Sequence, residues 1–321
     1  DCVVVTTSWK YHTEVVTYCM EQGIPVGSEV GGAYSLDECW HLVNTYEKTK
    51  TPYMFMENCN YGRRELMALN MVQQGVFGEI VHCSGCYGHD LREEISSGKE
   101  KRHYRLNEYL SRNCENYPSH ELGPIMQVLG INRTNRLLSL TSTASKAVGL
   151  HEYCLEHKAN NEELCQAKFA QGDVVTTVIT CEGGQTIVLT LDTTLPRYYS
   201  RGFTVRGTKG MYMEENDSIF LDGEHDGVEF KWKDYWNNAE EYVNKYEHPL
   251  WTTMTEEDRK TEHGGIDYLC YQDFFNRIRT GEPMPIDIYD AATMMCITPL
   301  SEKSIATGGQ PVVIPNFKEK K

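Results

Sequence analysis

The start of the chain alternates short apolar runs with segments of mixed polarity. The apolar runs at residues 1–6, 25–29 and 53–57 have the length and composition of strands buried in a parallel sheet. Between the first two, the apolar residues of segment 13–22 recur at helical spacing, and Gly23 supplies a stop signal. We therefore predict a strand, a helix and a second strand before residue 30.

A second helix start signal follows. Ser35 precedes Glu38 as in a capping box, and Leu36, Trp40 and Val43 then recur at helical spacing. The order strand, helix, strand, helix, strand is half of a doubly wound, Rossmann-type parallel sheet in an α/β protein.

The other half of such a sheet does not precede these elements. In dinucleotide-binding folds the first strand leads into a glycine-rich turn that holds the pyrophosphate, and no G-x-G-x-x-G motif occurs in the 321 residues. Asp1 opens directly into an apolar run, without a signal peptide. We expect the missing N-terminal half, roughly 90 to 100 residues in units of ~30, to lie upstream. The compartment, cytoplasmic or periplasmic, stays open because an export signal would lie there.

The pattern changes after the predicted helix 63–74. Segments 174–181 and 185–193 alternate apolar and polar residues and flank a Gly-Gly turn, which predicts an antiparallel hairpin. We therefore predict two domains: residues 1–78 as the C-terminal half of a dinucleotide-binding domain, and residues 79–321 as an α+β substrate domain with a large, mainly antiparallel sheet.

Two long stretches, 92–117 and 222–264, are polar and rich in Tyr and Trp. Long segments of this kind in a compact domain are usually functional lids or disordered insertions. Their aromatic content favours lids.

Charge and composition narrow the class of ligand. The net charge of −15 disfavours phosphate backbones and anionic membranes, so we expect no nucleic-acid partner. No run approaches the ~20 apolar residues of a membrane span. Twenty Tyr and five Trp are compatible with a neutral sugar, because aromatic faces pack well against sugar rings.

The twelve cysteines show no regular spacing of the kind a disulfide framework needs, which favours a reducing compartment. Cys83-Ser-Gly-Cys86 has no second metal-binding pair, and residues three apart on a strand face opposite sides of a sheet. We expect no metal site.

Several segments resemble the Gfo/Idh/MocA superfamily. Thr6-Thr-Ser-Trp9 with His12 resembles its strand-end motif near the nicotinamide ribose, and the segment from Ser28 to Gly32 stands where these proteins carry Glu-Lys-Pro. Within the superfamily, four motifs in order resemble glycoside hydrolase family 109, whose members are NAD-dependent α-N-acetylgalactosaminidases. The four motifs are Glu57-Asn-Cys-Asn-Tyr-Gly62, Tyr87-Gly-His-Asp-Leu-Arg92, Asn113-Cys-Glu-Asn-Tyr-Pro-Ser-His120 and His263-Gly-Gly-Ile-Asp267. Two departures are Ser8, where Pro is usual, and Glu121, where Gly is common.

The resemblance implies a reaction in which NAD⁺ transiently oxidises sugar C3, a base removes the C2 proton, the C1 substituent is eliminated, and water and hydride return. NAD-dependent glycosidases are an exception to the two-carboxylate mechanism. The superfamily dehydrogenases use the Lys of Glu-Lys-Pro to move a proton, and Val30 cannot do so. This difference favours the glycosidase.

The resemblance also assigns candidate residues. His120, at the entry of a predicted helix 120–129, is the candidate catalytic base, since an imidazole suits proton transfer at neutral pH. Tyr117 is the candidate for the second proton. The remaining candidates are Arg105, Tyr199 and His263 for the sugar and Trp9, His12, Glu29 and Asn58 for NAD.

Alternatives stay open at this point. A dehydrogenase acting on a free sugar would produce net NADH, and a sugar-binding protein would not turn over at all. His120 is otherwise a helix cap or a core residue, and Trp9 otherwise a packing residue. The formation of homo-oligomers is undecided.

Overall fold

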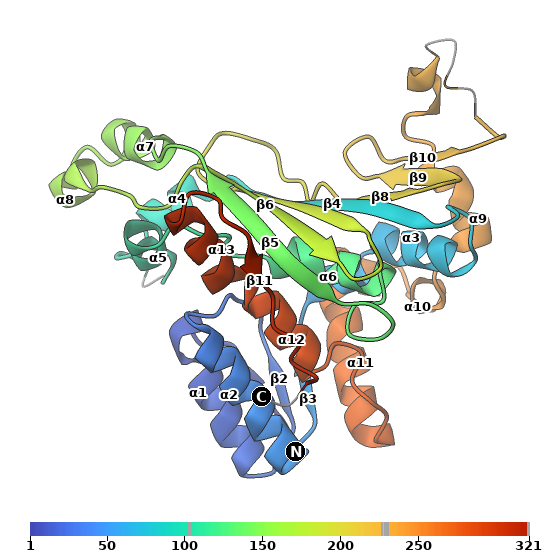
Figure 1. Cartoon of the computed structure of the whole chain (residues 1–321), viewed down its shortest axis with the longest axis horizontal. Helices are drawn as coiled ribbons and strands as arrows, with labels where there is room; N and C mark the ends of the chain where they lie inside the picture. Colours follow the sequence, from blue (N-terminus) through green and yellow to red (C-terminus); the bar gives the residue numbers. More distant parts are fainter. Residues whose placement is uncertain (102–103, 226, 228–230, 320–321) are drawn as a thin grey trace.

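The structure, a computed structural model, describes residues 1–101, 104–225, 227 and 231–319. Near both chain ends lies a small parallel sheet with the strand order β1-β2-β3 (Figure 1). Its strands are β1 Val3–Val5, β2 Val26–Ser28 and β3 Tyr53–Phe55. The parallel sheet predicted from the three apolar runs is confirmed.

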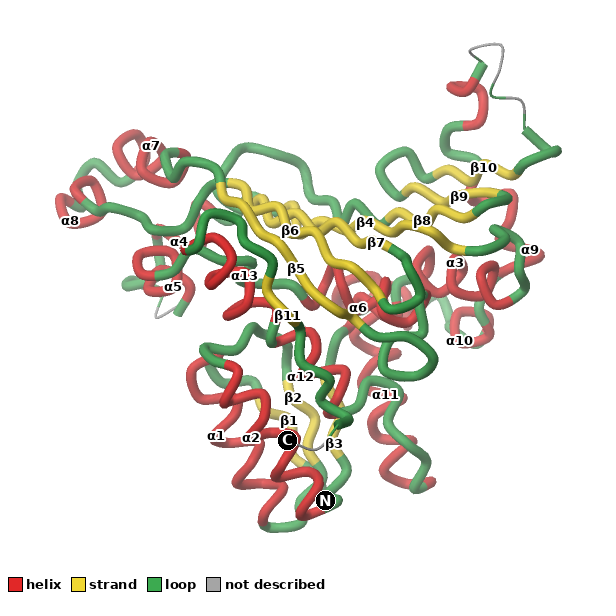
Figure 2. Tube along the Cα trace, viewed as in Figure 1, coloured by secondary structure: helices red, strands yellow, loops and turns green. Residues whose placement is uncertain are grey.

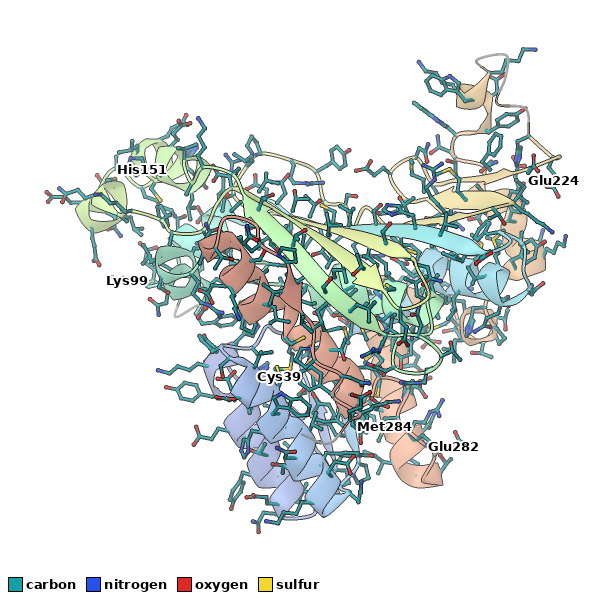
Figure 3. The ribbon with its side chains drawn as sticks, viewed as in Figure 1. Cys39, Lys99, His151, Glu224, Glu282 and Met284 are labelled. Carbon is teal, nitrogen blue, oxygen red and sulfur yellow. The ribbon has the colours of Figure 1, made fainter. Side chains whose placement is uncertain are left out.

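Helices from both ends of the sequence enclose this sheet. α1 (Trp9–Glu21) and α2 (Leu36–Thr49) connect its strands, and α12 (Ile288–Met295) packs against α2 and β3. Cys39 on α2, labelled in Figure 3, is fully buried close to Cys296 at the end of α12. The C-terminal part of the chain thus completes the packing of its first strands.

The predicted capping box at the start of α2 forms only in part. The N–H of Glu38 donates to Ser35 Oγ at 3.3 Å. The Glu38 carboxylate, however, accepts from the N–H of Tyr34 at 2.8 Å rather than from Ser35. The hydrogen bond from the Glu38 carboxylate is thus made to the residue before the N-cap, and it still satisfies a backbone N–H next to the start of the helix.

A large eight-stranded sheet dominates the rest of the molecule, in the order β10-β9-β8-β4-β7-β6-β5-β11 (Figure 2). Of its neighbouring pairs, β4 with β7 is parallel and the others are antiparallel. The strands are β4 Ile80–Gly88, β5 Leu137–Ala144, β6 Val174–Cys181, β7 Thr186–Asp192, β8 Thr204–Gly207, β9 Gly210–Met213, β10 Ser218–Leu221 and β11 Val312–Val313.

The predicted hairpin is confirmed as β6 and β7, whose alternating residues divide between two faces. On β7, Ile187, Leu189 and Leu191 are buried, whereas Val178 on β6 is 39% exposed. α6 (Ser119–Val128) packs on β4, and α13 (Ile297–Ala306) packs on β5 (Figure 1). One face of the sheet therefore supports the helix that carries His120.

The two long stretches predicted as lids contain short helices instead of open loops. Tyr109 is fully buried and its OH lies 2.6 Å from Thr193 Oγ1, and Trp251 Nε1 donates to the carbonyl of Tyr61 at 2.8 Å. These aromatic side chains anchor the stretches to the core, whereas Trp232 and Trp236 are exposed. Residues 102, 103, 226 and 228–230 of these stretches lie outside the described residues.

Further helices complete the described chain. They are α3 Arg63–Gln73, α4 Arg92–Ser96, α5 Arg105–Ser111, α7 Gly149–His157, α8 Glu162–Gln166, α9 Val243–Tyr246, α10 Pro249–Thr252 and α11 Ile266–Thr280, with 3-10 turns η1 Asn58–Tyr61, η2 Trp232–Tyr235, η3 Ala239–Tyr242, η4 Asp258–Lys260 and η5 Glu262–Gly265. None of the described helices combines the length and apolar character that crossing a bilayer requires.

Candidate active site

A cleft of about 360 Å³ opens where the chain leaves the small sheet and meets the large one. Its walls come from η1, the end of β4, the start of α6, the loop after β7, and the turn before α11. The lining residues are Asn58, Cys59, Tyr87, His89, His120, Tyr199, Arg201, His263 and Ile266. Four residues predicted from sequence, Asn58, His120, Tyr199 and His263, thus come together.

The centre of the cleft is a hydrogen-bonded pair from two distant segments. His120, on the first turn of α6, places Nδ1 2.7 Å from Oε1 of Glu57, which follows β3. The same carboxylate oxygen accepts from the N–H of Cys59 at 3.0 Å. Glu57 is fully buried, whereas the His120 side chain is 14% exposed toward the cleft.

The ionisation of Glu57 decides the tautomer of His120. Burial alone would raise the pKa of Glu57, but the charge and hydrogen bond of His120 and the N–H of Cys59 outweigh burial and lower it. An ionised carboxylate can only accept, so Nδ1 of His120 must donate. In the neutral form of the ring, Nε2 then carries the lone pair, and this is the arrangement that a general base needs.

Aromatic rings pack against His120. The ring of Tyr117 meets His120 edge-on at 4.7 Å between centroids and lies 4.5 Å from the ring of Tyr87. The Arg105 guanidinium lies 4.9 Å from the centroid of Tyr117 and 5.2 Å from that of Trp9. Arg105 therefore sits behind Tyr117, among the aromatic rings and away from the cleft wall.

Both tyrosines keep their phenol protons. Burial raises the pKa of Tyr117 and of Tyr87 well above the ordinary value, although the positive charge of Arg105 acts in the opposite direction. A neutral phenol is a hydrogen-bond or proton donor. Tyr87 lines the cleft directly, whereas Tyr117 is 7% exposed beneath it.

The strand ends of the small sheet are joined to the cleft through α11. Asn58 Nδ2 donates to Asp267 at 2.5 Å, Asp267 also binds His263 Nδ1 at 2.7 Å, and Tyr271 OH donates to Glu29 at 3.1 Å. Burial, and to a smaller extent the charge of Asp267, raises the pKa of Glu29. Asp267 therefore joins Asn58 to His263, and Glu29 is bound to the same helix through Tyr271.

Trp9 and His12, predicted to contact a cofactor, are buried on α1, which follows strand β1 of the small sheet. Trp9 Nε1 donates to the carbonyl of Val30 at 3.1 Å, and His12 Nε2 lies 2.6 Å from the carbonyl of Thr7. Burial lowers the pKa of His12, which favours its neutral form. Both side chains fix the turns after β1 and β2, and their contact with a cofactor stays a prediction.

Within the described part of the chain, one group of side chains has metal-ligand spacing: Glu57, Cys59 and His120, with ligand atoms within 4.8 Å of each other. Burial raises the pKa of the Cys59 thiol well above its ordinary value, so a thiolate ligand is disfavoured. The hydrogen bond between Glu57 and His120 already uses Oε1 of the carboxylate and Nδ1 of the imidazole. We interpret this group as a hydrogen-bonded pair beside a neutral thiol.

Sequence reasoning missed six residues of the site: Glu57, Cys59, Tyr87, His89, Arg201 and Ile266. All of them except Arg201 stand inside segments that it had singled out as motifs, so a signal existed. No sequence pattern pointed to Arg201, because its position at the cleft depends on a contact with a distant residue. Glu65 Oε1 of α3 accepts a hydrogen bond from Arg201 Nε at 2.8 Å.

Comparison with known proteins identifies the family of this chain. Residues 61–321 match the family model described as glycosyl hydrolase 109, C-terminal domain. The chain is 40% identical to a glycosyl hydrolase family 109 protein of Parabacteroides distasonis, covering 99% of this chain and 71% of that protein. It is 38% identical to an alpha-N-acetylgalactosaminidase of Tannerella forsythia, covering 99% and 70% respectively.

Solved structures share the fold at low sequence identity. A levoglucosan dehydrogenase in complex with NADH and levoglucosan aligns with a TM-score of 0.69 and 16% identity, over 98% of this chain and 80% of that one. An inositol dehydrogenase homologue of Azotobacter vinelandii, complexed with NADH and myo-inositol, aligns at 0.66 and 15%, over 97% and 77%. The chain therefore belongs to glycosyl hydrolase family 109 and is a glycosidase that shares its fold with these dehydrogenases.

Proposed function

We propose that the protein hydrolyses α-linked N-acetylgalactosamine-type sugars with NAD as a bound cofactor. The observation that carries the proposal is His120, which lines the cleft and whose Nδ1 lies 2.7 Å from Oε1 of Glu57, so that the neutral ring has its lone pair on Nε2. The substrate class rests on the named activity of the Tannerella forsythia relative. We take residues 1–78 as the second half of a dinucleotide-binding domain and residues 79–321 as the substrate domain.

The residues at the strand ends fit the nicotinamide end of the cofactor. In open α/β sheets, ligands bind at the carboxyl ends of the strands, where Glu29 and Asn58 lie. Gly31 and Gly32, which follow β2, pack closely against other side chains: a Cβ at Gly31 would lie 2.4 Å from Trp9 Cδ1, and one at Gly32 would lie 2.2 Å from Thr298 Oγ1. The carboxylate of Glu29 and the amide of Asn58 suit ribose hydroxyls and a carboxamide.

Each residue then has a proposed role. When bound, NAD⁺ supplies reversible hydride acceptance from sugar C3, so that no NADH accumulates over a cycle. His120 Nε2 accepts the proton from sugar C2, and Glu57 stabilises the imidazolium that results. Neutral Tyr117 donates a hydrogen bond or a proton to the sugar. Tyr199 and His263 contact its outer face, and Arg105 acts through the rings it touches.

Val30 does not separate hydrolysis from net dehydrogenation. Its side chain is 7% exposed and its carbonyl accepts from Trp9 Nε1. An apolar side chain cannot take the proton of the sugar C3 hydroxyl, and that proton leaves with the hydride in both reactions. The preference for hydrolysis therefore rests on the family and on the named activity of its member.

The test uses the protein expressed from its complete reading frame with NAD⁺. Wild type is expected to release nitrophenol from p-nitrophenyl α-N-acetylgalactosaminide without net NADH. His120→Asn keeps an amide for Glu57 but has no base, and should lower kcat about 100- to 10,000-fold. His157→Asn, on exposed α7, is the matched control and should behave as wild type.

Other outcomes assign other functions. NADH that accumulates with free sugars, without nitrophenol release, would make the protein a dehydrogenase. A protein that binds sugar but neither binds NAD nor turns over would be a sugar-binding protein. Full activity in His120→Asn would remove His120 from the reaction.

A further inference from the structure

Two buried carboxyl groups flank the segment that carries Tyr117 and His120. Glu115 precedes this segment and is 0% exposed, and Glu121 follows it and is 1% exposed. Neither forms an ion pair with any Lys, Arg or His that the structure describes. The proposed reaction gives neither group a role, so their burial needs another explanation.

Both glutamates tie the segment to its surroundings. The N–H of Glu115 donates to Ser301 Oγ of α13 at 2.8 Å, and Glu115 Oε1 faces the N–H of Tyr117 at 3.5 Å. Glu121 Oε2 accepts from the N–H of Thr190 in β7 at 3.0 Å. The backbone of Glu115 therefore connects the segment to α13, its carboxyl group faces the segment's own backbone, and the Glu121 side chain connects the segment to the large sheet.

The sheet is shaped to receive Glu121. A Cβ at Gly85 of β4 would lie 2.9 Å from both the Cβ and the carbonyl oxygen of Glu121. Because Gly85 has no side chain, the first turn of α6 rests directly on β4. This close approach brings the Glu121 carboxyl group against the large sheet, next to the backbone of β7.

One oxygen of each carboxyl group has no hydrogen-bond partner. Glu115 Oε2 and Glu121 Oε1 are fully buried and accept no hydrogen bond. The two carboxyl groups are close enough to act on each other, and a hydrogen bond between them would satisfy both oxygens. Two carboxyl groups can form such a bond only if one of them holds a proton. Burial raises the pKa of Glu115 to about 8, and burial and the charge of Glu115 raise that of Glu121 well above its ordinary value.

We propose that Glu115 and Glu121 share a proton, and that this acid pair positions the segment bearing Tyr117 and His120. Loss of the proton at alkaline pH places two negative charges side by side in the core and releases the segment. The kinetic part of this inference rests on the proposed function, since its readout is the glycosidase reaction. The proton-sharing part stands on the fold alone.

The neighbouring titratable groups do not compete for this role. Tyr109 and Cys114 face Glu115, and Cys86 faces Glu121. Burial raises the pKa of all three, to about 12 for Cys86, so they are neutral near pH 8. Charged groups beyond them are the Arg112–Glu302 pair, at 2.7 Å, which acts on Cys114, and the Arg197–Asp192 pair, also at 2.7 Å, whose Arg197 contacts the Cys86 sulfur.

The kinetic test compares wild type with the double variant Glu115→Gln/Glu121→Gln. Two amides can keep the mutual hydrogen bond but cannot titrate. With an apparent pKa near 8, wild-type kcat should fall about tenfold between pH 7 and pH 9. The double variant should fall by less than about twofold. Glu156→Gln, on the exposed face of α7, controls for the loss of a surface charge and should follow wild type.

A second measurement does not depend on activity. A carboxyl group with a raised native pKa stabilises the fold at low pH, and this contribution is lost as pH rises from its unfolded value toward about 8. The free energy of unfolding of wild type should therefore fall with rising pH over this window. The double variant should lose this slope. If it does not fold, Glu115→Gln alone replaces it in both measurements.

The outcomes separate the two proposals. The acid pair would be overturned if kcat fell equally at alkaline pH in wild type and in the double variant, or if the unfolding free energy had the same pH dependence in both. It would also be overturned if wild type showed neither effect. A wild type without glycosidase activity would overturn the proposed function instead, and the unfolding slopes would then decide on the pair. A flatter profile and a lost slope in the double variant would establish it.

Discussion

Replacing Glu57 with Gln tests whether the carboxylate fixes the tautomer of His120. The substitution keeps the size of the side chain and removes its charge. The Gln amide can turn its NH₂ group toward Nδ1, which then accepts, so the proton moves to Nε2. Nε2–H at the cleft wall can no longer accept a proton from the sugar.

The contacts set the expected magnitude. Oε1 of Glu57 accepts from Nδ1 at 2.7 Å and from the N–H of Cys59 at 3.0 Å, and both are hydrogen bonds to a charged group. Hydrogen bonds of this kind contribute about 1.5–3 kcal/mol. Returning His120 to the productive tautomer without the carboxylate costs about that much, so kcat should fall roughly 10- to 150-fold.

The assay is steady-state hydrolysis of p-nitrophenyl α-N-acetylgalactosaminide at pH 7, with kcat and KM determined separately. KM should change little, because Glu57 is buried behind His120. Glu57→Asp retains the charge but shortens the side chain and should recover part of the loss. A Glu57→Gln enzyme with wild-type kcat would refute the argument that this carboxylate sets the tautomer.

Further predictions concern stability and the outer cleft. Because the pKa of Glu57 is lowered, its ionised form stabilises the fold above pH ~4.5 and this is lost as pH falls further, so Glu57→Gln should weaken the acid dependence of the unfolding free energy. Gly85→Ala should cost about 1–3 kcal/mol in denaturant titrations, because its Cβ would meet Glu121 at 2.9 Å; an unchanged midpoint would contradict the close approach of α6. Trp251→Phe removes the bond to the carbonyl of Tyr61 and should cost about 1–3 kcal/mol in the same titrations; no loss would mean that water replaces the bond. His263→Ala should raise KM about fivefold and leave stability within ~0.5 kcal/mol, since its side chain is 67% exposed; an unchanged KM would remove it from the sugar site.

The sequence alone determined the local elements. The period-two alternation of residues 174–193 and its Gly-Gly turn predicted β6 and β7, and the apolar runs before residue 60 predicted the small parallel sheet. These patterns are readable because each depends on neighbours in the chain and on which face of an element is buried. The motif segments also placed His120 and Asn58 at the cleft.

Only the tertiary structure decided which groups meet. Glu57 and His120 are 63 residues apart, and α6 approaches Glu57 closely at Gly123, where a Cβ would lie 2.9 Å from Glu57 Cγ. Arg105, predicted to grip the sugar, turns inward onto the ring of Tyr117. Burial, not residue type, sets the charge of Glu115. Contacts and desolvation of this kind depend on packing between distant segments, and no local pattern of residues encodes them.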